Sequence, residues 1–238
     1  MRRKSYPASF GETLLKVEHL SVNNADGFPV VNDVSFSVRR GEIFAIAGVA
    51  GNGQVEVADA IAGLVAAAGG RIFIGEQEIT DETVRQRNEH GLAYIPEDRQ
   101  TWGLILNFTL SENLLLKRYY QEPYCVKGVL HREKFDEKSR ELIEAFDIRS
   151  GQGEQTTVRS MSGGNQQKAI VARELDQNAP CIVFVQPTRG LDIGAIEHIH
   201  SQILAERDKG KAILLVSLEL DEIMNLADTI GVIYNGQL

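Results

Sequence analysis

The stretch EIFAIAGVAGNGQVEVADAIAGL, residues 42–64, decides the fold of this chain. An apolar run over residues 43–47 gives way to glycines at positions 48, 51 and 53, and apolar residues then return at helical spacing over residues 57–64. The pattern predicts a strand, a tight loop and a helix in succession. Such a loop gathers backbone N–H groups at a helix N-terminus, where the helix dipole also favours negative charge. Its expected ligand is a chain of phosphates.

The loop by itself leaves three interpretations open. The phosphate-loop pattern GxxxxGK[ST] places its glycines on Gly48 and Gly53, but Gln54 stands at the lysine position and Val55 at the position of the hydroxyl that binds Mg²⁺. The dinucleotide pattern GxGxxG starts at Gly51 but meets Glu56 where its third glycine belongs. A glycine-rich turn that binds nothing is the third interpretation.

Composition and charge narrow the class of protein. The chain has 238 residues, enough for one large domain or for a core with a subdomain, and its net charge of -8 argues against a nucleic-acid partner. Its two cysteines lack the spacing of a zinc site or a disulfide framework, and no apolar run is long enough to span a membrane. We therefore expect a soluble protein whose contact with any membrane is peripheral.

Apolar periodicity predicts an α/β fold. Alternation over residues 14–22 and 30–38 indicates an antiparallel pair of strands, and residues 109–146 show a helical pattern. Strands and helices alternate after that, which indicates a parallel core sheet with crossover helices. Further strands are expected at residues 43–47, 71–75, 91–95, 181–185, 212–217 and 229–234, and further helices at 166–175, 193–207 and 220–226.

We expect a tail or linker at residues 1–13 and a domain at 14–238 with a helical subdomain at about 100–165. A turn at Asn235-Gly236, followed at once by the end of the chain, suggests a fragment of a longer polypeptide.

Two further motifs follow the loop in a fixed order. SMSGGNQQK, residues 160–168, opens a helix with a serine and two glycines, and QPTRGLD, residues 186–192, ends an apolar strand. Together with the loop at residues 48–55 they resemble the phosphate loop, the signature and the Walker B region of ATP-binding-cassette ATPases, over residues 14–236. With IPEDR at residues 95–99, they are similar to the second cassette in the ATPase subunit of bacterial nucleoside and simple-sugar importers. The resemblance implies a P-loop cassette fold.

The departures from the family pattern fall on the hydrolytic machinery. Gln54 and Val55 are two of these departures. In addition, the resemblance places Val185 at the position of the Walker B aspartate and Gln186 at that of the catalytic glutamate. It places Glu97 at the position of the loop glutamine and Leu218 at that of the switch histidine. Phosphoryl transfer needs positioning, a metal and neutralisation of charge, and these groups are replaced here. We therefore expect no catalytic residue and no metal ligand in this chain's own site, and an isolated domain without ATPase activity.

The resemblance also implies a division of labour. Its phosphate-loop residues would hold ATP, weakly at most, and its signature would act in trans on the Mg²⁺-dependent ATP site of a partner cassette. The phosphate-loop residues are Gly48, Gly51, Asn52, Gly53, Gln54 and Val55. The signature residues are Ser162, Gly163, Gly164, Asn165 and Gln166.

The expected partners follow from the same resemblance. They are a second cassette that precedes this one in the same polypeptide, membrane permease subunits and, indirectly, an extracellular solute-binding protein. The region of Trp102-Gly103 resembles the part that contacts the permease. The expected location is the cytoplasmic face of the cell membrane. Two alternatives stay open: a noncatalytic nucleotide-sensing or structural cassette, and a dinucleotide-dependent oxidoreductase, for which the sequence offers no hydride-transfer site.

Overall fold

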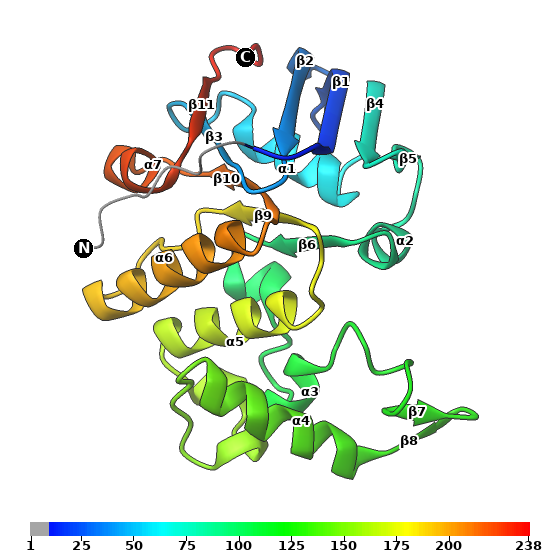
Figure 1. Cartoon of the computed structure of the whole chain (residues 1–238), viewed down its shortest axis with the longest axis vertical. Helices are drawn as coiled ribbons and strands as arrows, with labels where there is room; N and C mark the ends of the chain where they lie inside the picture. The colour runs from blue at the N-terminus through cyan, green and yellow to red at the C-terminus, as the bar shows by residue number, and fades with distance from the viewer. Residues whose placement is uncertain (1–9) are drawn as a thin grey trace. The chain divides into compact units, whose positions relative to one another are not determined.

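The computed structural model describes residues 10–238, which fall into two compact units. The first unit comprises the described residues up to Tyr94, residues 178–187 and residues 200–238; the second comprises residues 95–177 and 188–199. Figure 1 shows the elements of each. The predicted bounds of the tail, residues 1–13, and of the helical subdomain, about 100–165, stay predictions, and residues 1–9 lie outside the described part.

The first unit contains two sheets. Strands β1 (Thr13–Asn23), β2 (Pro29–Arg39), β4 (Gly69–Ile74) and β5 (Gln77–Glu78) pair antiparallel in the order β2-β1-β4-β5. A second sheet has the order β11-β3-β10-β9-β6, from β3 (Ile43–Ala47), β6 (Leu92–Ile95), β9 (Cys181–Val185), β10 (Ala212–Val216) and β11 (Thr229–Val232). In it, β10 pairs parallel with β3 and β9, and β11 pairs parallel with β3. The predicted parallel core sheet and the predicted antiparallel strands are confirmed, and the antiparallel strands form a sheet of their own.

Helix α1 (Gln54–Ala62) fills the space between the two sheets. It contacts β1 and β2 on one side and β9 and β10 on the other, as Figure 1 shows. Its buried residues, such as Val57, Ala58 and Ile61, join one apolar core with Leu20 and Val34 of the antiparallel strands. Strands β9 and β10 are buried along their whole length, which explains their continuous apolar sequence. The loop before α1 is therefore anchored at both ends in the core.

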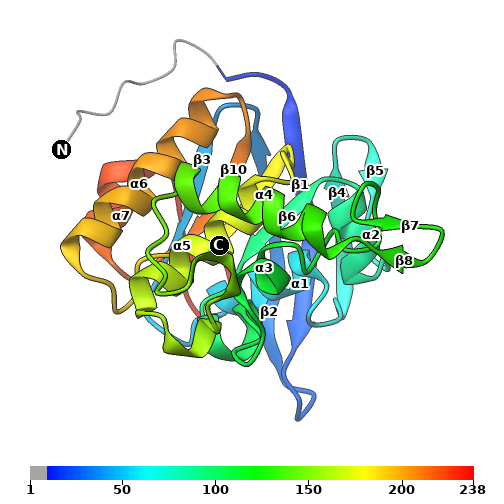
Figure 2. The same cartoon turned by 90° about the horizontal axis from the view of Figure 1, so that it is seen from below.

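The second unit is mainly helical. Helices α3 (Leu110–Leu114), α4 (Arg132–Ala145) and α5 (Gly163–Leu175) pack on one another, as Figure 2 shows from below. Short helical turns η1 (Arg99–Gly103), η2 (Gly153–Gln155) and η3 (Val158–Ser160) connect them. Helix α6 (Ile193–Asp208) begins in this unit and ends in the first, where α7 (Leu220–Leu226) follows. Among residues 10–238, no helix is both long enough and apolar enough to cross a membrane.

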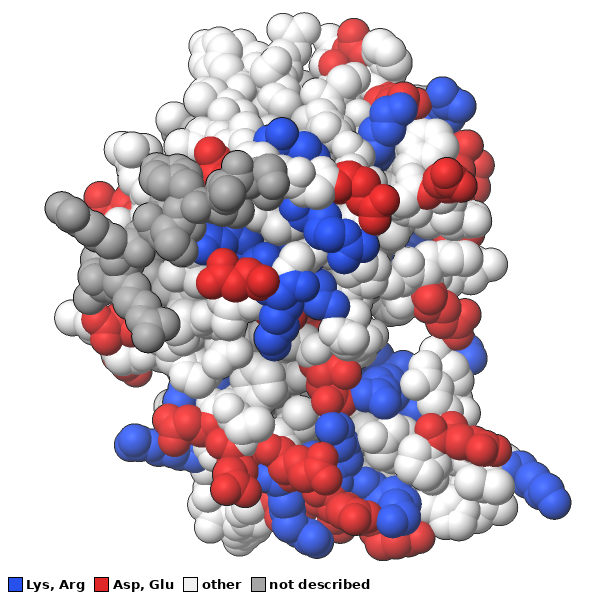
Figure 3. Space-filling model, viewed as in Figure 1, with Lys and Arg blue, Asp and Glu red and all other residues white. Residues whose placement is uncertain are grey.

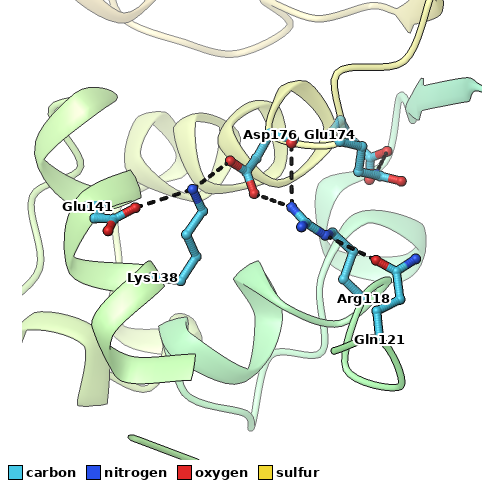
Figure 4. A network of polar contacts seen from close by, with 7 residues as sticks. Arg118, Gln121, Lys138, Glu141, Glu174 and Asp176 are labelled. Atoms are coloured by element: carbon cyan, nitrogen blue, oxygen red, sulfur yellow. Dashed lines mark hydrogen bonds and ion pairs between the residues drawn. The ribbon is translucent and has the colours of Figure 1, made fainter. Parts of the chain in front are cut away.

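Polar contacts join the helices of the second unit. Asp176, which follows α5, accepts from Arg118 at 2.5 Å and from Lys138 of α4 at 2.9 Å, as drawn in Figure 4. Burial would raise the pKa of Glu174, but the neighbouring Lys117 and Arg173 lower it below its ordinary value, so this carboxylate is charged. Over the face in Figure 3, acidic and basic side chains are intermixed.

The continuous helical pattern predicted over residues 109–146 is wrong in its middle part. A two-stranded hairpin, β7 (Cys125–Val126) and β8 (Val129–Leu130), separates α3 from α4. Its turn places Lys127 at φ 52° and Gly128 at φ 81°, in the left-handed region that a helix does not contain. Helix α2 (Val84–Glu89), which the sequence did not reveal, has only one buried residue, Arg87, so it shows no apolar stripe.

Arg87 fixes the C-terminal end of α1. Its guanidinium is 3% exposed and donates to the carbonyl oxygens of Ala60 at 2.5 Å and Ile61 at 2.8 Å, and also to those of Thr80 and Glu82. Two of these carbonyls lie in the last turn of α1, where carbonyl groups lack the full set of intrahelical partners. One side chain thus connects the end of α1 with the segment before α2.

We expect Arg87→Met to destabilise the chain by about 3 kcal/mol, because it removes several charge-assisted hydrogen bonds from a buried site. Urea unfolding followed by circular dichroism measures the change in the free energy of unfolding. The matched control is Arg85→Met on the same helix, since Arg85 is exposed and forms a surface ion pair with Glu89; this change should cost at most about 0.5 kcal/mol. Equal losses for the two variants would contradict the role assigned to Arg87.

Candidate functional site

The candidate site begins at the carboxyl edge of the parallel sheet in the first unit. Val216 of β10 is paired with Ile46 of β3 on one side and with Val185 of β9 on the other. The residues that follow these three strands therefore emerge at one level, and ligands of open α/β sheets bind at such an edge. They are the loop at residues 48–53, Gln186, and the segment Ser217-Leu218.

The glycines of the loop are needed for contacts with the protein itself. Gly53 is the N-cap of α1 at φ 103°, and a Cβ there would lie 2.6 Å from the carbonyl oxygen of Val30. A Cβ on Gly48 would lie 2.8 Å from the carbonyl oxygen of Ile233. The loop is thus enclosed between β2 and the segment that follows β11, so these two glycines have a packing role whether or not a phosphate binds.

Gln54 and Val55 turn inward at the start of α1. The side chain of Gln54 is buried; its Oε1 accepts from the backbone N–H of Asn52 at 3.1 Å and its Nε2 donates to the carbonyl oxygen of Val49 at 3.0 Å. Val55 is half-buried and packs against the apolar core. Gln54 therefore supplies no positive charge to a phosphate, and Val55 supplies no hydroxyl to a metal ion bound to that phosphate.

Gln186 follows β9 with a backbone in the left-handed region, at φ 49°. Its N–H donates to the carbonyl oxygen of Val216 at 2.8 Å, and its buried side chain accepts, through Oε1, from the N–H of Leu218 at 3.3 Å. A carboxamide held in this way is no general base, since it has no basic lone pair at neutral pH.

The position expected to carry the Walker B carboxylate is also apolar. Val185 is fully buried in the core, and Leu218 has no titratable group. Among residues 10–238, no group of three or more His, Cys, Asp or Glu side chains comes together as a metal site. Residues 54, 55, 185, 186 and 218 therefore supply neither a positive charge for a phosphate chain nor a carboxylate or hydroxyl for a Mg²⁺ ion.

The signature segment lies in the second unit, at the start of α5. Ser162 is the exposed N-cap; its Oγ accepts from the N–H of Asn165 at 3.4 Å and from the Nδ2 of Asn165 at 2.9 Å. Asn165 accepts in turn from the N–H of Arg149 at 2.8 Å, and the buried Gln166 donates to the carbonyl oxygen of Val158 at 3.1 Å. The backbone N–H groups of Gly163 and Gly164 belong to the first turn, which has no intrahelical acceptors. The N-terminus of α5 thus presents a hydroxyl and two N–H groups.

Two arginines near this segment were missed by sequence reasoning. Arg99 donates to the carbonyl oxygen of Arg189 at 2.7 Å, and its Nη2 lies 3.4 Å from the place where a Cβ on Gly163 would be. Arg189 is ion-paired with Glu97, the residue at the expected loop-glutamine position. Both arginines lie inside the quoted motifs, but 90 residues separate them, and no spacing rule relates them.

Together, the glycine loop between a parallel strand and a helix, and the second helix N-terminus at residues 162–166, define a cassette-type nucleotide-binding domain. A scan against protein-family models agrees, because the model described as "ABC transporter" matches residues 31–189. The chain belongs to the ABC transporter family.

Similar proteins come from several bacteria. The chain is 46% identical over 228 residues to the guanosine import ATP-binding protein NupO of Bacillus subtilis, covering 96% of this chain and 44% of that protein. It is 44% identical to the nucleoside import ATP-binding protein NupA of Lactococcus lactis (95% and 45% covered), and 36% identical to the ribose import ATP-binding protein RbsA of Caldanaerobacter subterraneus (97% and 45%). The chain spans less than half the length of each.

Solved structures share the fold. The nucleotide-free ATP-binding cassette of an ABC transporter superposes with a TM-score of 0.79 at 24% identity, covering 94% of this chain and 89% of that one. A dimeric cassette solved with ADP and phosphate gives 0.80 at 20% identity, covering 94% and 96%. The predicted cassette fold is confirmed.

Proposed function

We propose that this chain is one of two nucleotide-binding domains in the ATPase subunit of an importer of nucleosides or simple sugars. It does not hydrolyse ATP at its own loop, and its signature completes the ATP site of the partner cassette. The observation that carries the proposal is the contrast between its two halves. The loop side has neutral or apolar side chains at every position that needs a charge, whereas the signature side keeps a complete helix N-terminus with Ser162 exposed.

The loop side supports a noncatalytic role through its contacts. Gln186 has its carboxamide engaged with the N–H of Leu218, and Val185 is fully buried, so no residue there orients a water molecule or binds Mg²⁺. Loss of one transition-state contact costs about a hundredfold to a thousandfold in rate. Loss of several together leaves no useful rate of hydrolysis.

The signature side supports a role in trans. Backbone N–H groups at a helix N-terminus stabilise a terminal phosphate, and they do so without a charged side chain. A cassette of this fold has been solved as a dimer bound to ADP and phosphate. In the proposed pair, Ser162, Gly163, Gly164, Asn165 and Gln166 close over ATP and Mg²⁺ held by the partner's loop.

The names of the relatives supply the proposed cargo and assembly. They describe import of guanosine, nucleosides and ribose, and this chain spans 44–45% of the three proteins compared. We infer a second cassette that precedes this one in the same polypeptide, permease subunits in the membrane, an extracellular solute-binding protein, and a place on the cytoplasmic face. In this proposal residues 14–238 are the cassette.

We expect the isolated chain to release phosphate from MgATP only at background rate. Gln54→Lys with Val55→Thr should tighten ATP binding, because a charge-assisted hydrogen bond contributes about 1.5–3 kcal/mol, but should not create turnover while Val185, Gln186 and Leu218 remain. Steady-state phosphate release and calorimetric binding separate the two effects. Sustained Mg²⁺-dependent turnover that coelutes with the purified chain would contradict the assignment of its catalytic positions.

We expect Ser162→Arg to lower ATPase activity and solute uptake of the complete transporter by at least about a hundredfold, because the ATP of the partner cassette loses its contact with the signature. Gly164→Asp should act alike, but a Cβ there would lie 3.2 Å from the Cβ of Ala195, so the exposed Ser162 gives the cleaner test. Substitution of Gln54 or Val55 should change the rate by no more than about threefold.

Ser37→Arg is the matched control, since Ser37 is exposed on β2 and lies outside the loop and the signature. All variants are compared after assembly with the permease has been verified. Losses as severe in the Gln54 and Val55 variants as in Ser162→Arg would refute the division of labour.

A further inference from the structure

The side chain of Gln54, the first residue of α1, bridges two residues of the loop that precedes it. It is 1% exposed, and its two polar atoms bridge the loop, with Oε1 on the N–H of Asn52 and Nε2 on the carbonyl oxygen of Val49. A phosphate oxygen at a helix N-terminus is held by N–H groups of the same kind as that of Asn52. The carboxamide oxygen therefore takes one of the donors that a phosphate would use.

Several other polar groups of the loop are bonded within the protein as well. The Nδ2 of Asn52 donates to the carbonyl oxygen of Val49 at 2.8 Å, and its Oδ1 accepts from the N–H of Asn235 at 2.8 Å. The N–H of Gly236 donates to the carbonyl oxygen of Asn52 at 3.0 Å, and the carbonyl oxygen of Gly236 accepts from the N–H of Asn32. Asn52 therefore connects the loop with the turn at residues 235–236, and the N–H of Asn32 in β2 holds that turn through Gly236.

We propose that the Gln54 carboxamide occupies the phosphate loop. It competes with the phosphate chain of a nucleoside di- or triphosphate for the N–H of Asn52. This inference rests on the proposed function in treating the loop as noncatalytic. A nucleotide must break both hydrogen bonds of Gln54 and expel its side chain before it gains the same donor. Because the carboxamide is tethered, it competes at high effective concentration.

An occupied loop and a missing lysine predict different effects of shortening Gln54 on nucleotide affinity. If the loop bound nucleotide weakly only because a positive charge is absent, shortening Gln54 would leave the affinity unchanged or lower it. If Gln54 occupies the loop, shortening it releases the N–H of Asn52 and opens the space. The carbonyl oxygen of Val49 keeps its contact with Asn52, so the change leaves no loop carbonyl without a donor.

The test measures binding of ADP to the purified chain by calorimetry or by displacement of a fluorescent ADP. Gln54→Ala should bind ADP about tenfold more tightly than the unaltered chain, a change of about 1.4 kcal/mol. Gln54→Glu should bind no more tightly than the unaltered chain, because it keeps an acceptor for Asn52 and adds a negative charge that repels phosphate. Gln77→Ala, at an exposed position on β5, is the matched control and should bind as the unaltered chain does.

Amide hydrogen exchange supplies a second measurement that needs no nucleotide. The N–H of Asn52 should be protected in the unaltered chain and in Gln54→Glu, and should exchange at least about tenfold faster in Gln54→Ala. Thermal unfolding of each variant verifies that the fold is retained. Affinity for ADP that stays the same, falls or remains undetectable in Gln54→Ala, or an Asn52 N–H that exchanges equally fast in all variants, would overturn the proposal. The proposed function fails separately, in the transport assay of the signature variants.

Discussion

The parallel pairing of β10 with β3 and β9 is the interaction on which the rest of the structure depends. It brings Ile46, Val216 and Val185 to the same level, so that the three segments following these strands share one edge. Because both faces of β9 and β10 are buried, a change of register would move every side chain to the opposite face and disrupt the packing on both. The position of the loop at residues 48–53 relative to Gln186 and Leu218 is therefore set by the pairing of the core strands.

The fold has kept its architecture while the chemistry at that edge has changed. Gln54 and Gln186 each place a neutral carboxamide where the family pattern has a charge. The carboxamide of Gln54 bonds to backbone through both of its polar atoms, and that of Gln186 through its oxygen alone. A buried charge without a partner would be far costlier than a buried amide with one. In the proposed division of labour, the loop need not bind Mg²⁺, so neutral side chains are compatible with it, whereas the signature at Ser162 relies on backbone N–H groups.

Much of the fold could be predicted because apolar periodicity reports burial directly. The strands β3, β9 and β10 were found within a residue or two, and the predicted turn at Asn235-Gly236 is confirmed by mutual hydrogen bonds between Tyr234 and Gln237. The hairpin at residues 125–130 was missed, because exposed residues carry little apolar signal and its turn depends on backbone angles.

Much less of the site could be predicted. The motifs locate the loop and the signature, but the contacts of Gln54 with Asn52 and Val49 depend on side-chain conformation. The contact of Arg99 with Arg189 joins segments far apart in sequence. Such contacts follow from the packed structure and have no pattern in the linear sequence.

Protection of residue 162 from alkylation tests the central claim most directly, that the signature acts on ATP held by another cassette. Ser162→Cys is made in the complete ATPase subunit with its other reactive cysteines, Cys125 included, replaced by serine. Cys181 can remain, because it is fully buried and burial raises the pKa of its thiol to about 12. The account predicts that MgATP protects the introduced thiol in the assembled subunit and not in the isolated chain. Equal alkylation with and without ATP in the assembled subunit, or equal protection in the isolated chain, would contradict it.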